Sequence, residues 1–518
     1  MQSLTPLLLL SLTSLISATT PLSAPNPPSN TTYTNPLLPG WHSDPSCVFI
    51  PTLSNTTFCI TSPFLTFPGL PLYSSRDLRT WTLARNVFNR PEQVKEFAGL
   101  DTNADEGFWA ATARYYLFSS EDPFDDSSWS EGLRVENPQK TIDPDLFWDD
   151  DGQFYMASGW GGIYLSTVNL TTGAVSTPAT RTWNGTGGSN PEGPHIYKKD
   201  GWYYLLIAEG GSGPNHSATI ARSPSIWGPY ESYAGWGGEV VGCSLATRSG
   251  PEFEVAPMGR ETVPFPVEGP EGRWPVVAPV RGVMIGWSRP AAASPPRPGG
   301  EEGILVDGAD VVDFRPGEKM PRNWVHHRLP TASSFVVSPR GHEKTLQLVP
   351  SAANLTGNKE VEVADGLTFV GRRQSATLFK FSVDIDFDAK IEGEEAGITT
   401  TGTDGAATTT QRQLRFRATT FGKPNITAPG EVVVDIPRSW MGGPVRLIVE
   451  ARDDEVYIFS ASSTRGKKGE GEVREMGRAR AGIVTGGSGR FVGTLVGAYA
   501  TRNNGTGTAK AYLSRWSR

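Results

Sequence analysis

Residues 142–158 read IDPDLFWDDDGQFYMAS, and residues 191–208 read PEGPHIYKKDGWYYLLIA. In each stretch an acidic residue precedes a short strand, an Asp-Gly turn follows, and an aromatic-rich strand comes next, which is the pattern of a β-hairpin. Asp143 and Glu192 each precede the turn glycine by nine residues. The equal spacing predicts that the two stretches are copies of one repeat, with the two acids at equivalent positions.

The distances between acids along the chain indicate what the repeat builds. Asp143 and Glu192 are 49 residues apart, and Asp44 lies 99 residues before Asp143, close to two such periods. Hairpin-built repeats of about 40 to 50 residues are typical of propeller blades, whose first strands line a central channel. Five blades that begin near Asp44 end near residue 290, where the Pro-rich stretch 291–303 follows as a linker. We therefore expect three carboxylates in one pocket.

Beyond about residue 330 the pattern changes to longer strands. Over residues 379–387 apolar side chains alternate strictly with polar ones, and residues 445–462 have the pattern of a hairpin. Convincing long amphipathic helices are hard to find anywhere in the chain. The sequence therefore predicts an all-β protein: a five-bladed β-propeller over residues 33–325, followed by a β-sandwich of the jelly-roll or concanavalin-like kind over residues 330–518.

The composition of the 518 residues argues against several classes of partner. With 37% hydrophobic and 19% charged residues the chain is an ordinary globular protein, and its 58 glycines and 42 prolines suit many short strands. A formal net charge of −7 without a long basic run argues against nucleic acid or an anionic membrane surface as the main partner. A neutral substrate fits better, and the oligomeric state stays open.

The N-terminal residues predict export. Residues 1–20 hold an apolar stretch followed by small residues, which is the pattern of a secretory signal peptide and is too short to span a bilayer. We therefore expect a secreted, extracellular glycoprotein. Eight Asn-x-Ser/Thr sequons support this expectation, at Asn30, Asn55, Asn169, Asn184, Asn215, Asn354, Asn425 and Asn504.

The cysteine positions leave two alternatives. Cys47 and Cys59 lie symmetrically about a turn-like stretch, so they face each other if the two flanking runs form a hairpin. In an oxidising compartment they form a disulfide, and otherwise they are two buried free thiols. Cys243 would be left over in either case.

Several of these motifs resemble those of glycoside hydrolase family 43, five-bladed propeller enzymes that act on xylosides and arabinofuranosides. The resemblance implies that Asp44 is the general base that activates water and Glu192 the general acid that protonates the leaving oxygen. It also implies that Asp143 orients Glu192 and raises its pKa. The similar segments extend over nearly the whole chain after the signal segment: residues 35–47, 61–81, 142–152, 191–211, 259–269, 274–282 and 371–387.

The same resemblance implies substrate-binding residues. Arg248 corresponds to an arginine that contacts substrate near the acids, with a surface ion pair as the alternative. Phe64 and Trp109 correspond to aromatics that line the pocket, with packing inside a blade as the alternative. No cofactor and no metal site are implied, because the acidic run 149–151 lacks the calcium-loop pattern and is read as a solvated hairpin turn.

The resemblance implies a secreted hydrolase that releases terminal β-D-xylosyl or α-L-arabinofuranosyl residues from plant cell-wall oligosaccharides. We expect inversion of configuration, because Asp44 and Glu192 start separate strands and must leave room for water. Blade segments that the family carries are missing between Arg114 and Leu117 and within residues 236–246. These gaps motivate a rival hypothesis, a non-catalytic or vestigial carbohydrate-binding propeller, and lead us to expect weak activity. An endo-acting arabinanase is a third hypothesis, against which the appended sandwich counts.

Overall fold

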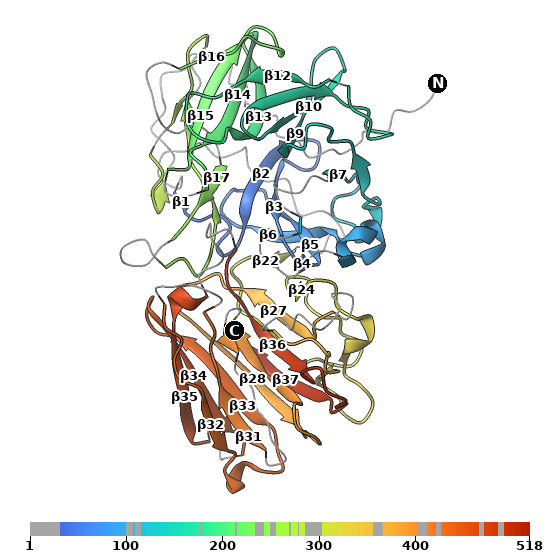
Figure 1. Cartoon of the computed structure of the whole chain (residues 1–518), viewed down its shortest axis with the longest axis vertical. Helices are drawn as coiled ribbons and strands as arrows, with labels where there is room; N and C mark the ends of the chain where they lie inside the picture. Colours follow the sequence, from blue (N-terminus) through green and yellow to red (C-terminus); the bar gives the residue numbers. More distant parts are fainter. Residues whose placement is uncertain are drawn as a thin grey trace.

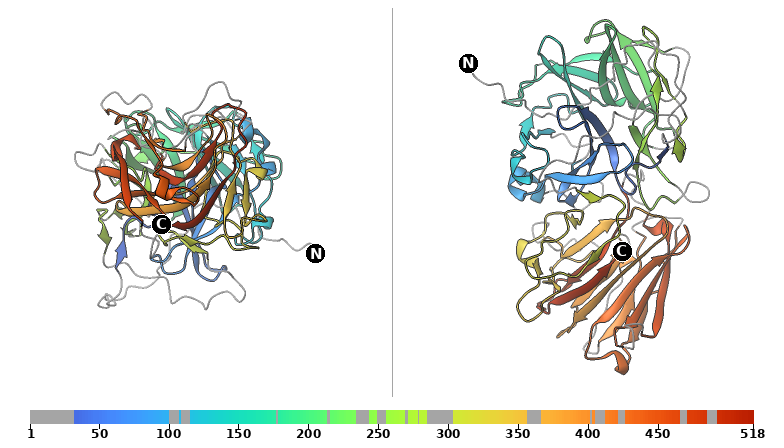
Figure 2. Two further views of the ribbon diagram at one scale, coloured as in Figure 1. Left: turned by 90° about the horizontal axis from the view of Figure 1, so that it is seen from below. Right: turned by 180° about the vertical axis from the view of Figure 1, so that it is seen from behind.

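Two strand-rich units lie end to end in the computed structural model of the chain (Figure 1). The view from behind shows the same arrangement, with the C-terminal unit in orange and red (Figure 2). The structure describes residues 32–99, 107–108, 115–176, 178–212, 215–233, 243–248, 255–268, 271–277, 279–284, 303–355, 366–400, 403–404, 412–420, 426–465, 471–484 and 492–518.

Strands dominate both units, so the predicted all-β class is confirmed. None of the helices in the described ranges has the length and apolar character needed to cross a membrane. The described helices are all short 3₁₀ helices: η1 (Pro91–Gln93), η2 (Lys95–Gly99), η3 (Asp126–Ser128), η5 (Ala332–Ser334), η7 (Arg438–Trp440) and η8 (Ala481–Ile483).

The N-terminal unit is a β-propeller whose three largest described blades are antiparallel sheets. The first blade contains β2 (Ser43–Ile50), β3 (Thr56–Ser62), β5 (Gly69–Ser75), β6 (Thr82–Phe88) and β22 (Ile304–Leu305). Another contains β9 (Ile142–Trp148), β10 (Phe154–Gly159), β11 (Ile163–Thr167) and β12 (Thr180–Trp183). The next contains β13 (Glu192–Lys199), β14 (Trp202–Glu209), β15 (Ser217–Ser223) and β16 (Glu231–Ser232).

The other described strands of the propeller form two-stranded sheets. They pair β7 (Tyr115–Leu117) with β8 (Leu133–Val135), β17 (Cys243–Ala246) with β18 (Glu261–Pro264), β19 (Val267–Glu268) with β20 (Val276–Val277), and β1 (Tyr33–Thr34) with β21 (Val283–Met284). β7 and β17 lie at the two places where blade segments were expected to be missing. Residues 109–114 and 234–242 lie outside the described part, so the number of five blades stays a prediction.

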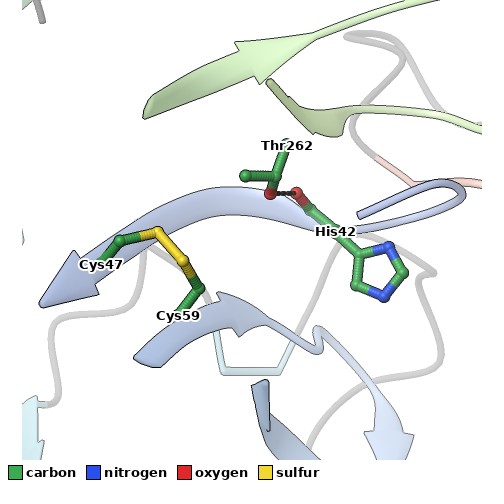
Figure 3. Close-up of a disulfide and its surroundings, with 4 residues drawn as sticks. All are labelled: His42, Cys47, Cys59 and Thr262. Carbon is green, nitrogen blue, oxygen red and sulfur yellow. Dashed lines mark hydrogen bonds between the residues drawn. A yellow bond between two sulfur atoms is a disulfide. The ribbon is translucent and has the colours of Figure 1, made fainter. Parts of the chain in front are cut away.

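The inner strands pack around the centre of the propeller. β9 packs against β13, and β2 packs against β17. The hairpin β2–β3 has the register that the sequence predicts, since Cys47 pairs with Cys59. Their sulfur atoms form a disulfide, so the alternative of two free thiols is wrong (Figure 3). This bond fastens β2, the strand that carries Asp44, to its neighbour.

Three of these inner strands, β2, β9 and β13, contain a β-bulge at the same place in their hairpins. The pairing shifts between Ser43 and Ser46 in β2, between Ile142 and Asp145 in β9, and between Glu192 and His195 in β13. The residue after the first position of each bulge is left-handed, with φ of 52° at Asp44, 54° at Asp143 and 58° at Gly193. A proline follows in all three strands. Asp44, Asp143 and Gly193 are therefore the equivalent positions.

This register corrects the prediction that Asp143 and Glu192 are equivalent, because Glu192 lies one position earlier in its bulge. The hairpin loops differ in length, since Trp148 pairs with Phe154 whereas Lys199 pairs with Trp202. The difference in loop length offsets the one-residue shift of Glu192. The number of residues from each acid to its turn glycine is therefore the same only by coincidence. Sequence spacing alone does not separate the two arrangements.

The C-terminal unit is a β-sandwich. One sheet has the order β25 (Phe335–Val337), β26 (Leu346–Leu348), β37 (Ala511–Ser517), β28 (Phe379–Phe387), β33 (Val445–Ala451), β34 (Val456–Ser463) and β35 (Val473–Arg480). A second has the order β27 (Phe369–Arg373), β36 (Leu495–Thr501), β29 (Glu395–Thr400) and β30 (Thr403–Asp404), and β31 (Gln413–Phe416) pairs with β32 (Val432–Asp435). The predicted strand over residues 379–387 and the predicted hairpin within residues 445–462 are confirmed by β28 and by β33–β34.

The chain passes between the two units several times within residues 303–330. β22 pairs with β6 as the fifth strand of the first blade. β23 (Val311–Val312) then pairs with β37 of the sandwich, and β24 (His326–His327) returns to pair with β4 (Thr66–Phe67) of the propeller. The predicted domain boundary between residues 325 and 330 falls within this exchange.

Candidate active site

The bulges of β2, β9 and β13 bring the three predicted acids together at the centre of the propeller. The charges of Asp44 and Glu192 both act on Asp143, and the charge of Asp44 acts on Glu192. The side chain of Glu192 is only 11% exposed, whereas that of Asp44 is 29% exposed. The site therefore combines one buried carboxyl with another that is open to water, which suits a pair that must hold different protonation states.

Asp143 reaches across from one blade to the next. Its Oδ2 accepts a hydrogen bond of 2.9 Å from the backbone N–H of Gly193, the residue that follows Glu192. The bulge separates this part of β13 from the regular pairing with β14, so the amide is directed toward the neighbouring blade. Asp143 thereby fixes the backbone position of Gly193 and, with it, the position of the neighbouring Glu192.

A parallel contact lies two residues further along the same strands. Asp145 is buried, and its two carboxylate oxygens accept from His195 Nδ1 and from the backbone N–H of Ile196, both at 3.2 Å. Burial lowers the pKa of His195, but the charge of Asp145 and the hydrogen bond to it outweigh burial, so the pKa is raised overall. Asp143 and Asp145 thus join β9 to the backbone of β13 on both sides of Pro144.

The electrostatics of the site favour a protonated carboxyl. Burial is the main cause that raises the pKa of Asp143 well above its usual value, and the charges of Asp44 and Glu192 add to it. Burial also raises the pKa of Glu192; the charge of Asp44 adds to this effect, and Arg260 opposes it. The charges of Asp143 and Glu192 repel each other, so the predicted role of Asp143 in raising the pKa of Glu192 stays a prediction.

Arg260 is the cation at the centre of the three acids. Its Nη1 lies 3.5 Å from Asp44 Oδ1, and its side chain is 9% exposed. Burial lowers the pKa of Arg260, while Asp44, Glu192 and Asp143 each oppose that shift. The guanidinium compensates part of the negative charge that the three carboxylates concentrate in one place.

Backbone hydrogen bonds hold the Arg260 and Asp44 segments side by side. The N–H of His42 donates to the carbonyl of Arg260 at 2.8 Å, and the hydroxyl of Thr262 donates to the carbonyl of His42 at 3.0 Å (Figure 3). The sandwich supports the same segment, because the N–H of Thr494 donates to the carbonyl of Pro257 at 2.8 Å. Both units therefore position the pair of Asp44 and Arg260.

His216 lies beside Glu192 without forming a charged pair. Its Nδ1 is 2.9 Å from the carbonyl of Gly211, which can only accept, so Nδ1 carries a hydrogen. The same nitrogen is 3.9 Å from Glu192 Oε1. Burial and the charge of Arg260 lower the pKa of His216. A neutral imidazole therefore faces Glu192 at near-neutral pH.

Arg248 makes a different set of contacts from those that the sequence predicts. Its guanidinium donates to both oxygens of Glu261, at 2.6 and 2.7 Å, and to the carbonyl of Ser375 in the sandwich at 3.1 Å. Glu261 is 1% exposed and also accepts from the N–H of Gly40 at 2.6 Å. In this structure Arg248 thus forms an ion pair at the junction of the two units. Its role in binding substrate stays a prediction.

Phe64, the one predicted aromatic residue within the described part of the chain, does not line an open pocket. Phe64 is 1% exposed and packs in a cluster with Trp41 and with Phe369 of the sandwich, so in this structure it follows the alternative of packing. Trp109 lies outside the described residues. The acidic run 149–151 does form a hairpin turn, but Asp149 is largely buried and accepts from Lys198 and from the hydroxyl of Tyr203.

The sequence analysis missed Arg260 of this site and did not single out Trp160, which is close to the site along the chain. Arg260 was covered by a matched segment, but a lone arginine beside a glutamate has the appearance of a surface pair. Trp160 follows Gly159, whose backbone lies against the Cα of Glu192, and its indole is 54% exposed. An exposed tryptophan between glycines, GWGG, is the signal that marks it. Among the described residues no group of three His, Cys, Asp or Glu side chains is arranged to hold a metal ion.

Comparisons with known proteins agree with this geometry. Residues 33–236 match the model of glycosyl hydrolases family 43, and residues 311–516 match the beta xylosidase C-terminal concanavalin A-like domain. The chain is 26% identical to the non-reducing end alpha-L-arabinofuranosidase BoGH43B of Bacteroides ovatus, over 93% of each chain. It is 28% identical to the xylosidase/arabinosidase 43B of Humicola insolens, over 91% of this chain and 95% of that protein.

Solved structures give the same result. The Bacteroides ovatus xyloglucan locus protein GH43B superposes with a TM-score of 0.75 at 25% identity, over 94% of this chain and 99% of that one. A xylan beta-1,4-xylosidase from Bacillus halodurans superposes with a TM-score of 0.73 at 22% identity, which supports the fold. The chain is therefore a glycoside hydrolase that belongs to glycosyl hydrolases family 43 and carries the C-terminal domain of its beta xylosidases.

Proposed function

We propose that this glycoside hydrolase is secreted and releases terminal β-D-xylosyl or α-L-arabinofuranosyl residues from plant cell-wall oligosaccharides, with inversion of configuration. The observation that carries the proposal is the convergence of Asp44, Asp143 and Glu192 around Arg260. The names of the two relatives, an arabinofuranosidase that acts at non-reducing ends and a xylosidase/arabinosidase, support the substrate class.

In the proposed reaction each carboxyl has a separate role. Asp44, the more exposed acid, takes a proton from the water that attacks the anomeric carbon. Glu192, whose pKa is raised by burial, donates a proton to the leaving oxygen on the opposite side of the sugar. Asp143 is a positioning residue, because its contact with the Gly193 amide fixes the start of β13. The exposed indole of Trp160 beside this site is a surface on which a sugar ring can stack.

Hydrolysis of two aryl glycosides, a β-D-xylopyranoside and an α-L-arabinofuranoside, tests activity and preference together. Proton NMR of the first sugar released then reports the stereochemistry. We expect the anomer opposite to that of the substrate, and initial retention would contradict the proposed inversion. The control is the Asp150→Asn variant, since Asp150 stands 88% exposed at a hairpin tip and has no proposed role.

The rival hypothesis of a non-catalytic carbohydrate-binding propeller is favoured by one observation. In the part of the chain that the structure describes, β7 and β8 form a sheet of two strands, whereas the three largest blades have four or five. Binding of xylo-oligosaccharides by folded protein without release of sugar would favour this rival. Short oligomers rather than monosaccharide from debranched arabinan would instead favour an endo-acting arabinanase.

Secretion has its own test. Expression of the full chain in a secreting eukaryotic host, followed by mass spectrometry of the medium, should recover protein whose first residue lies shortly after residue 20 and whose mass falls after glycosidase treatment. Retention inside the cells with the N-terminal residues intact would contradict this part of the proposal.

A further inference from the structure

A cavity of about 20 Å³ lies where the first blade meets the sandwich. His42 and Tyr73 line it from the propeller, and Arg372 and Arg373 line it from β27 of the sandwich. Asn323 lines it from the segment that passes between the two units, and the other polar residues of the lining are Asn86, Arg322 and Ser375. The three acids of the active site do not line the cavity, so it is a separate feature.

The lining carries positive charge and includes no carboxylate. Arg372 is neutralised, because it forms an ion pair of 2.8 Å with Asp310. Arg373 is 8% exposed, and within the described part of the chain no carboxylate lies at ion-pair distance from it. One of its terminal nitrogens donates to the hydroxyl of Thr66 at 3.0 Å, and its Nε has no hydrogen-bond partner. A buried cation without a counter-charge is costly to a folded protein.

Asn323 provides a second, independent observation. Both polar atoms of its side-chain amide are shielded from solvent, and neither has a hydrogen-bond partner in the described structure. Polar atoms that are buried in this way are normally paired, so an unpaired donor that lines a cavity indicates a group inside the cavity. The amide of Asn323 and the Nε of Arg373 are two such donors in one cavity.

Two further polar groups of the lining, His42 and Tyr73, do not supply the missing negative charge either. The Nδ1 of His42 lies 3.1 Å from the carbonyl of Gly40, which can only accept, so Nδ1 carries the hydrogen. The hydroxyl of Tyr73 therefore donates to Nε2 at 2.7 Å. Burial, with the charge of Arg373, lowers the pKa of His42 to about 3. Burial also raises the pKa of Tyr73, so both groups are uncharged at neutral pH.

We propose that this cavity binds one small monovalent anion of the size of chloride, which Arg373 and Asn323 hold by hydrogen bonds and charge. The small volume of about 20 Å³ suits a single small ion. The anion compensates the charge of Arg373 and accepts from the unpaired amide. The residues that hold the anion come from the sandwich and from the crossing segment, and the walls of the cavity come from the first blade. The bound anion therefore stabilises the junction of the two units.

Thermal unfolding of the full chain at constant ionic strength, with chloride replaced stepwise by the larger gluconate ion, tests the proposal. We expect the Tm to rise by about 2 to 4 °C between gluconate and saturating chloride. The Arg373→Met variant should lose this dependence. The control variant Arg315→Met removes an arginine that is 65% exposed and should keep it.

Crystals of the unchanged protein grown in bromide make the test independent of whether the variant folds. An anomalous peak beside Arg373 and Asn323 would support the site. Absence of that peak would overturn the proposal and leave water as the occupant. A chloride effect of equal size in Arg373→Met would also overturn it, because the effect would then come from salt acting elsewhere on the protein.

Discussion

The propeller and the sandwich are held together in different ways. In the sandwich one continuous cluster, which includes Phe381, Val449 and Trp516, joins the strands of both main sheets. In the propeller the buried apolar residues form several smaller clusters within and between blades. The contacts that join β9 to β13 beside the active site are polar, from Asp143 and Asp145 to backbone amides. Directional hydrogen bonds hold the active site in place, whereas the burial of apolar side chains stabilises the sandwich.

The backbone shows the same difference. Asp44 and Asp143 are held at left-handed φ angles, which cost a non-glycine residue on the order of 1 to 3 kcal/mol. Strain of this kind persists only where the surroundings compensate for it, and active sites are where it concentrates. The comparison therefore teaches that activity and stability depend on different residues. Variants in the two units should separate the two properties.

The largest effect is expected at the acids themselves. Asp44→Asn and Glu192→Gln should each lower kcat on an aryl glycoside by about 10² to 10⁴, because each removes a proton transfer. The Tm should stay the same or rise, since each change removes a charge from a crowded cluster. Activity assays and thermal unfolding of the same preparations check both statements. Near wild-type turnover in either variant would reject the assigned roles.

The next effect is expected in the sandwich core. Phe381 is fully buried in β28, and Phe381→Ala should lower the free energy of unfolding by about 3 to 5 kcal/mol. Activity per folded molecule should be unchanged at low temperature. The matched control is Leu378→Ala, since Leu378 is 60% exposed just before the same strand and its loss should cost little. A specific loss of kcat in folded Phe381→Ala would break the comparison.

A smaller effect is expected at the bulge of β13. Gly193 has a φ of 58°, and a Cβ there would meet Ala208 at an ordinary distance of 3.6 Å. Gly193→Ala should therefore fit sterically but cost about 1 kcal/mol of stability through its backbone conformation. Gly282→Ala, at a position with open space and no left-handed φ, is the control. Equal Tm values for the two variants would show that the bulge is not strained.

The last effect is a pH dependence at Asp143. Its pKa is raised in the folded state, chiefly by burial, so the folded protein binds this proton more tightly than the unfolded chain does. Stability is therefore lost as the pH rises above the unfolded pKa of about 4. Asp143→Asn avoids that loss, and its Tm should exceed the wild-type value at pH 7. The difference should vanish near pH 4, and a constant difference would contradict the assignment.

The sequence predicts the elements whose signal is local. The hairpin of Cys47 and Cys59 follows from the symmetry of two short runs, and β28 follows from strict alternation. Even so, Asp384 on the polar side of β28 is fully buried, because Arg446 and Arg515 cover it. Alternation shows which side chains share one face of a strand. It does not show which residues cover the opposite face.

The site is predicted less completely, because its contacts join residues far apart in the chain. The three acids stand out through a repeat and a family motif. Arg260 does not, since its partner Asp44 lies on another strand and no periodic pattern links the two positions. The position of Glu192 relative to Asp143 was misjudged by one residue, because loop length and bulge offset each other. Register is set by pairing across strands, which sequence spacing reports only indirectly.

The position of β22 in the first blade has a consequence for synthesis on the ribosome. Leu83 in β6 pairs with Ile304, which is translated 221 residues later. The hairpin of β2 and β3 needs only nearby residues and can close, with its disulfide, as soon as it emerges. The edge of β6, by contrast, has to wait until the rest of the propeller has been made. A nascent chain therefore exposes an unpaired strand edge for much of its synthesis, and chaperones have the most to protect at this place.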